Sequence, residues 1–93
     1  MAARIELAPE VLDDFDRIVE YVAGFGGDGG ARVAEIVEAI DVLANHPSIG
    51  RPVADGMREL IIGRRRRGFV ALYRYVESIE TVFVLAVRSQ REE

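Results

Sequence analysis

Arginine side chains in the C-terminal third carry the clearest chemical potential of this sequence. Four stand in a row from Arg64 to Arg67, and two more enclose Ser89 and Gln90 near the end of the chain. A guanidinium binds carboxylate or phosphate oxygens through paired hydrogen bonds, but it stays protonated and so does not carry protons. A solvated hairpin turn is the alternative interpretation of the run of four. We expect an anionic partner to be bound by Arg64, Arg65, Arg66, Arg67, Arg88, Gln90 and Arg91.

Groups that could transfer a proton are few. All twelve basic side chains are arginines and the chain has no cysteine, which leaves one histidine, three tyrosines and the carboxylates. His46 precedes Pro47 at the end of a predicted helix, where a solvated loop histidine is the simpler interpretation. Tyr73 shares a strand face with Tyr75, and packing in the core or at an interface explains it better than stacking on a base.

The sequence contains no cofactor or metal motif. Gly24 to Gly30 holds five glycines in seven residues. Phosphate-binding glycine loops follow a strand, and the P-loop form needs a lysine, so this segment is better explained as a connector between two helices. Asp13, Asp14 and Asp16 crowd one helix start, where the helix dipole accounts for them and no matching carboxylate cluster suggests a metal site. We expect neither a metal nor a cofactor.

Charge divides the chain into two halves. Residues 1–56 hold four arginines against eleven acidic residues, a net charge of −7, whereas residues 57–93 hold eight against five, a net charge of +3. An acidic half is typical of solvated helices. The basic half is where we expect an anionic partner to bind.

The 93 residues are enough for one domain, residues 1–93. Hydrophobic residues make up 49% of the chain, which indicates either an efficient core or apolar surface reserved for another chain. The opening residues lack the apolar run of a signal peptide, and no stretch approaches the length that spans a bilayer. We expect a soluble, cytoplasmic protein.

The N-terminal half reads as a strand and two helices. Arg4 to Leu7 alternates polar and apolar residues, as a short strand does. Pro9 fits the first turn of a helix that we expect to end near Ala23, and its apolar residues recur at three- and four-residue spacing. A second amphipathic helix is predicted from about Ala31 to Ala44. The apolar faces of such a helical hairpin require a sheet to cover.

The C-terminal third reads as three strands, which follow an irregular segment from Pro47 to Pro52. Their β-branched and aromatic residues are bounded by glycines or charges. In the last strand, Val82 to Val87 is apolar on both faces, so we expect it inside the sheet. The predicted fold is α+β, a two-layer β-α-α-β-β-β sandwich in which a helical hairpin packs on a mainly antiparallel sheet. The predicted strands are Arg58–Ile62, Phe69–Val76 and Thr81–Val87.

Over nearly its whole length the sequence resembles the RelE/ParE toxin superfamily, and within it the ParE-like toxins of type II toxin–antitoxin systems, also known as the plasmid stabilisation family. The resemblance rests on RIELAPEVLDDFDRIVEYV, LANHPSIGRPV, RELIIG and GFVALYRY…VFVLAVRSQRE. Its most specific part is the order of Leu43, Pro47, Gly50 and Arg51, followed by Arg58-Glu59-Leu60 and Tyr73-Arg74. The resemblance implies the same β-α-α-β-β-β fold, with the last strand beside the first.

The superfamily implies two kinds of activity. RelE-like toxins resemble ribonucleases that cut messenger RNA on the ribosome with lysine, arginine and a late tyrosine or histidine; here Arg88, Tyr73 and His46 would be the candidates. ParE-like toxins inhibit DNA gyrase by binding. This chain has no lysine, no tyrosine or histidine after Arg88, and an acidic pI of about 5.0 that suits phosphate binding poorly. We therefore expect gyrase inhibition without catalysis. An mRNA endonuclease and a non-toxic member that only forms the antitoxin complex are the alternatives.

The resemblance also implies a cognate antitoxin protein, which would cover the toxin with a helix and an extended segment. Operator DNA would be bound only through that antitoxin. We expect no membrane partner.

Overall fold

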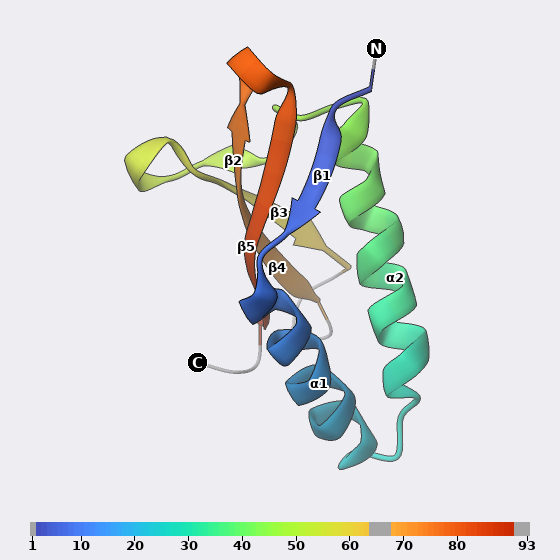
Figure 1. Ribbon diagram of the computed structural model, residues 1–93. Helices are drawn as coiled ribbons and strands as arrows, with labels where there is room; N and C mark the ends of the chain where they lie inside the picture. Colours follow the sequence, from blue (N-terminus) through green and yellow to red (C-terminus); the bar gives the residue numbers. More distant parts are fainter. Residues whose placement is uncertain (1, 64–67, 91–93) are drawn as a thin grey trace.

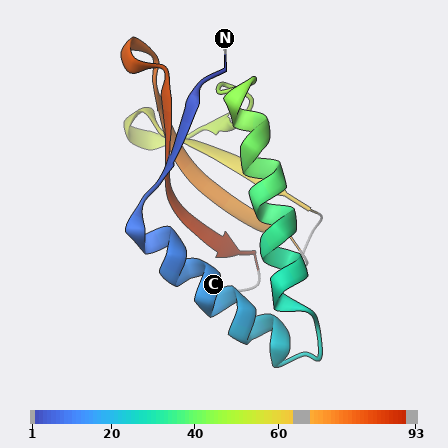
Figure 2. The ribbon, with the colours of Figure 1, turned by 45° about the vertical axis from the view of Figure 1, so that its right-hand side comes forward.

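The computed structural model describes residues 2–63 and 68–90, and in it two helices cover one face of a five-stranded sheet (Figures 1 and 2). No helix in this described part is long and apolar enough to cross a bilayer. The helices are α1 (Pro9–Ala23) and α2 (Gly29–Asp41), and the strands are β1 (Arg4–Leu7), β2 (Arg51–Pro52), β3 (Arg58–Ile62), β4 (Phe69–Val76) and β5 (Thr81–Ser89).

The strand order is β1-β5-β4-β3-β2, which places β5 inside the sheet. It pairs in parallel with β1 and antiparallel with β4. The predicted α+β architecture, the interior last strand and its position beside the first strand are therefore confirmed. The apolar composition of Val82 to Val87 on both faces fits this central position, because one face meets the helices and the other contributes Ala86 to the floor described below.

Several boundaries differ from the sequence prediction. Helix α2 ends at Asp41 and not at Ala44, and β5 continues to Ser89, past the predicted end at Val87. Helix α2 begins at Gly29, because the side chain of Asp28 caps it by accepting a hydrogen bond from the Ala31 N–H at 3.1 Å. The last two glycines of the expected connector thus belong to the helix. The segment expected to be irregular also contains the two-residue strand β2, in which Arg51 pairs with Glu59 and Pro52 with Arg58.

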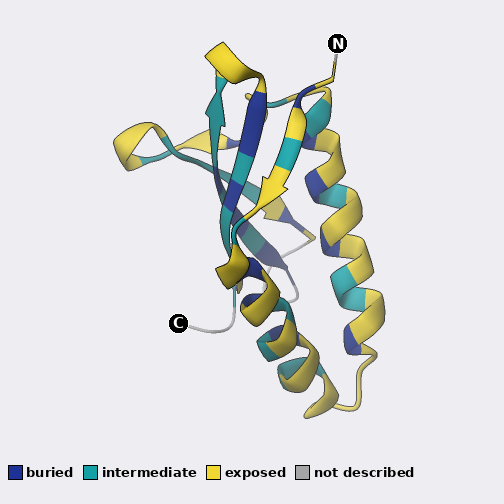
Figure 3. Ribbon diagram, viewed as in Figure 1, coloured by how far each residue is buried: buried dark blue, intermediate teal, exposed yellow. Residues whose placement is uncertain are grey.

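The core lies between the helices and the sheet. Buried residues of α2 lie on the side that faces the sheet (Figure 3). Alternate residues of β4 point into this layer, as the pleat of a strand requires. The largest fully buried side chains are Val11, Ile18, Ile36, Leu43, Tyr73, Val82, Val84 and Val87.

Tyr73 ties the loop that follows the helices to the sheet. Its hydroxyl accepts a hydrogen bond from the Gly50 N–H at 2.9 Å and donates one to the Pro47 carbonyl at 2.8 Å. A Cβ at Gly50 would lie 2.6 Å from that hydroxyl oxygen, so only glycine fits there. Arg58 adds hydrogen bonds to the carbonyls of Ser48 and Gly50. These contacts explain why glycine occupies its position in the Pro-x-x-Gly-Arg motif. They also fix the position of Arg51, the first residue of β2.

Candidate functional site: a groove on the open face of the sheet

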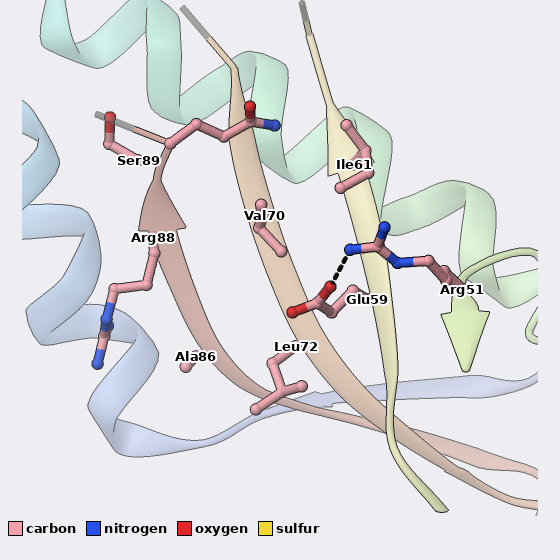
Figure 4. A pocket seen from close by; sticks show the side chains of 9 residues that line it. Arg51, Glu59, Ile61, Val70, Leu72, Ala86, Arg88 and Ser89 are labelled. Atoms are coloured by element: carbon pink, nitrogen blue, oxygen red, sulfur yellow. Dashed lines mark hydrogen bonds and ion pairs between the residues drawn. The ribbon is translucent and has the colours of Figure 1, made fainter. Parts of the chain in front are cut away.

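A groove runs across the face of the sheet that the helices leave uncovered (Figure 4). Because Phe69, Ala71 and Tyr73 point into the core, their neighbours on β4 point the other way. The groove has a volume of about 1020 Å³, at the upper end of the roughly 300–1,000 Å³ typical of ligand pockets. Its apolar floor consists of Ile61, Val70, Leu72 and Ala86.

Charged side chains stand at opposite ends of this floor (Figure 4). At one end Arg51 donates a hydrogen bond to Glu59 at 2.6 Å, across the β2–β3 pair. The Arg51 side chain is 69% exposed, so the ion pair adds little stability and is accessible to a partner. At the other end lie Arg88, Ser89 and Gln90, and the Gln90 N–H donates to the Gly68 carbonyl at 3.0 Å.

Arg88 is held by a buried carboxylate of α1. Its Nη1 donates to Oδ1 of Asp14 at 2.7 Å, and Nη1 of Arg17 donates to the same oxygen at 2.8 Å. The other oxygen, Oδ2, accepts the Val87 N–H at 2.9 Å. Figure 4 shows the Arg88 side chain directed toward α1 and away from Glu59.

The environment of Asp14 keeps this carboxylate ionised. Burial alone raises the pKa of Asp14, but the hydrogen bond from the Val87 N–H, the hydrogen bond from Arg17 and the charges of Arg88 and Arg17 outweigh it, and the pKa is lowered. The Asp14 side chain is only 7% exposed, whereas that of Arg88 is 56% exposed. The ion pair therefore joins a buried anion to a cation that a partner can reach.

Comparison with known proteins places the chain in a family. The model of the ParE toxin of the type II toxin–antitoxin system parDE matches residues 5–93. The chain belongs to the ParE toxin family. The comparison with curated proteins finds no match.

Solved structures of low sequence identity share the ParE-family fold. The chromosomal ParDE toxin–antitoxin system from P. aeruginosa matches with a TM-score of 0.79 and 22% identity, over 95% of this chain and 96% of that one. The toxin–antitoxin complex RelBE2 from Mycobacterium tuberculosis matches with a TM-score of 0.63 and 18% identity, over 97% and 100%. A form of the E. coli toxin RelE with two arginines replaced by alanine, in the free state, matches with a TM-score of 0.61 and 16% identity, over 96% of this chain and 84% of that one.

The predicted site residues of this ParE-family chain do not all converge. Arg88 and Gln90 line the groove. Tyr73 is fully buried on the opposite face of the sheet, and His46 is exposed just after the short helical turn η1 (Val42–Ala44). Neither lines the groove. The remaining candidates, Arg64, Arg65, Arg66, Arg67 and Arg91, lie outside the described residues.

Three residues of this candidate site were not predicted from the sequence to have a role in binding: Arg51, Glu59 and Asp14. Asp14 was explained there by the helix dipole alone, but the structure buries it against β5. Its position carried a signal, because it lies three residues after Val11 and four before Ile18, on the apolar stripe of α1. A charged residue on such a stripe requires a buried partner. In the described part of the chain no three histidines or acidic residues form a group that could hold a metal ion.

Proposed function

We propose that this chain inhibits DNA gyrase by binding it, and that a cognate antitoxin neutralises it by covering the same toxin. One observation carries the first part of the proposal. The groove offers guanidinium groups and an apolar floor, and none of its described lining residues is a tyrosine, histidine or lysine. Arginine binds and stabilises charge but does not exchange protons near neutral pH. Such a surface is suited to gripping another macromolecule.

The carboxylate among the described lining residues is already engaged. Glu59 accepts a short hydrogen bond from Arg51. The hydroxyl of Tyr73 lies on the opposite face of the sheet, where it already makes hydrogen bonds with the Gly50 N–H and the Pro47 carbonyl. Cleavage of a phosphodiester requires a base and an acid within hydrogen-bond reach of the reacting atoms. The separation of Tyr73 and His46 from Arg88 therefore favours binding over an mRNA endonuclease.

Two features favour neutralisation by an antitoxin. The matched solved structures include a ParDE toxin–antitoxin system and a RelBE2 toxin–antitoxin complex. In this chain the short strand β2 pairs only with Arg58 and Glu59, so the outer edge of β3 from Leu60 to Ile62 has no strand partner among the described residues. An extended segment of an antitoxin can pair with that edge while a helix fills the groove, and operator DNA would then be bound through the antitoxin.

The experiment that tests this proposal is DNA supercoiling by gyrase on relaxed plasmid. Purified wild-type protein is expected to inhibit supercoiling. The Arg88→Ala variant is expected to require about tenfold more protein, because a charge-assisted contact is lost. Arg32→Ala is a matched control, since Arg32 pairs with Glu35 on the exposed side of α2. No inhibition by wild-type protein at high excess would refute the proposal.

Induction in growing cells separates the alternatives. Arrest that a co-expressed antitoxin relieves, with intact messages in primer extension, is the expected result. Codon-spaced cuts in translated messages would indicate the endonuclease instead. Normal growth together with tight antitoxin binding would indicate a non-toxic member of the family.

A further inference from the structure

Strand β5 extends past the end of β1. The last paired residues are Leu7 and Val84, and the Ala8 N–H donates to the Val84 carbonyl at 2.9 Å. After that point α1 replaces β1 beside β5. The backbone groups of β5 that α1 covers are shielded from water, so side chains of α1 must satisfy them.

Side chains of α1 complete this edge at Val87. Oδ2 of Asp14 accepts the Val87 N–H, and Nη2 of Arg17 donates to the Val87 carbonyl at 3.3 Å. Asp14 thus takes the place of a strand carbonyl. This contact fixes the position of α1 along β5 at Val87, the residue immediately before Arg88.

The second oxygen of Asp14 then sets the direction of Arg88. Oδ1 accepts from Nη1 of Arg88, which also donates to the Val87 carbonyl at 3.3 Å. Within the described residues, the hydrogen bonds of the Arg88 guanidinium all use Nη1. Its Nε and Nη2 donors form one edge of a planar fork, and that edge suits a bidentate carboxylate.

We propose that Asp14 is the positioning residue for Arg88: it anchors Nη1 so that the Nε–Nη2 edge is presented, at the end of the groove, to a carboxylate of a bound protein. The inference rests on the proposed partner binding at this groove. A protein carboxylate is favoured over a nucleic-acid phosphate because the floor is apolar and, at the far end, Glu59 already neutralises the charge of Arg51. The described lining residues also include no aromatic ring on which bases could stack.

The first part of the test needs only the isolated toxin. Nitrogen-15 NMR of the arginine side chains is expected to show hindered rotation of the Arg88 guanidinium in the wild type and free rotation in Asp14→Asn. The asparagine oxygen still accepts the Val87 N–H, so this variant removes the anchoring charge while retaining the backbone contact. Asp13→Asn is the matched control, with the same change of charge at an exposed neighbour. Free rotation of Arg88 in the wild type would overturn the inference, whether or not a variant folds.

The second part measures gyrase inhibition and antitoxin affinity for Asp14→Asn, Arg88→Ala and the double variant. Each single change is expected to weaken binding about tenfold, and the double variant no more than Arg88→Ala, because Asp14 acts through Arg88. Additive losses, or tighter binding by Asp14→Asn, would overturn the inference. If the wild type binds antitoxin but does not inhibit gyrase, the proposed gyrase target is wrong. The NMR result and the antitoxin affinities of the single and double variants then still decide the role of Asp14.

Discussion

The hydroxyl oxygen of Tyr73 lies 2.9 Å from the backbone nitrogen of Gly50 and joins the middle of the sheet to the loop before β2. This side chain is fully buried, so its contacts have no replacement from water. Tyr73, a catalytic candidate on the sequence alone, therefore holds the loop before β2 against the sheet. Removal of its hydroxyl group should lower the stability of the fold.

Tyr73→Phe leaves the Gly50 N–H and the Pro47 carbonyl without their partner. We expect the free energy of unfolding to fall by about 1–3 kcal/mol, the range for a buried polar group left unsatisfied. Urea denaturation measures the loss. Tyr75→Phe is the control on the same strand, and we expect it to be nearly neutral. If Tyr73→Phe is as stable as the wild type, the two hydrogen bonds of this hydroxyl do not stabilise the fold and the prediction is wrong.

Gly29 and Gly30 are adjacent residues of α2 with opposite expected responses to alanine. A Cβ at Gly29 would lie 2.7 Å from the Cα of Val19, whereas at Gly30 its nearest contact is Oδ1 of Asp28 at 3.5 Å. Gly29→Ala should therefore push the helices apart and cost about 1–3 kcal/mol. Gly30→Ala should stabilise the helix by about 0.5–1 kcal/mol. Thermal unfolding of both variants checks the sign, and equal responses would rule out this close helix contact.

Asp14 should give the protein a specific acid sensitivity. Its pKa is lowered in the folded state, so its contribution is fully present above the unfolded pKa of about 3.9 and is lost as the pH falls through the folded value. Arg17 and Arg88 are the cationic side chains that face it. We expect the stability difference between wild type and Asp14→Asn to be constant from about pH 6 to 8 and to shrink below about pH 4. Denaturation at several pH values measures it, and a difference that grows on acidification would contradict the assigned direction.

Leu72 tests the floor of the groove. Leu72→Glu places a carboxylate among Ile61, Val70 and Ala86, where a partner would have to desolvate it. We expect affinity for gyrase and antitoxin to fall by at least about tenfold with little change in melting temperature. Ile79→Glu is the control, because Ile79 is 60% exposed on the turn before β5. Unchanged binding by Leu72→Glu would place the interface elsewhere.

The sequence predicts the architecture well, because apolar patterning determines it. The double-sided apolar run of Val82 to Val87 was sufficient to place β5 inside the sheet. The start of α2 was missed because Gly29 and Gly30 have low helix propensity, although Asp28 was a visible N-cap. The close approach of Val19 explains why position 29 is a glycine, and no local pattern encodes that contact.

The candidate site was only partly predictable. Arg88 and Gln90 were found from their residue types, and both line the groove. The pairing of Arg51 with Glu59 depends on the register of β2 and β3, which sequence spacing does not fix. Asp14 was missed because acidic residues on helices are usually solvated. Its burial follows from the place where β1 ends, a long-range relationship between strands.

The parallel pairing of β1 with β5 also affects the order of events during synthesis. The first strand finds its parallel neighbour only after both helices and the three other strands have been made, and Arg88, Ser89 and Gln90 complete the groove together with that neighbour. A nascent chain whose β5 is still inside the ribosome therefore lacks both the centre of its sheet and one end of the groove. Closure of the sheet and completion of the groove are a single late event in folding.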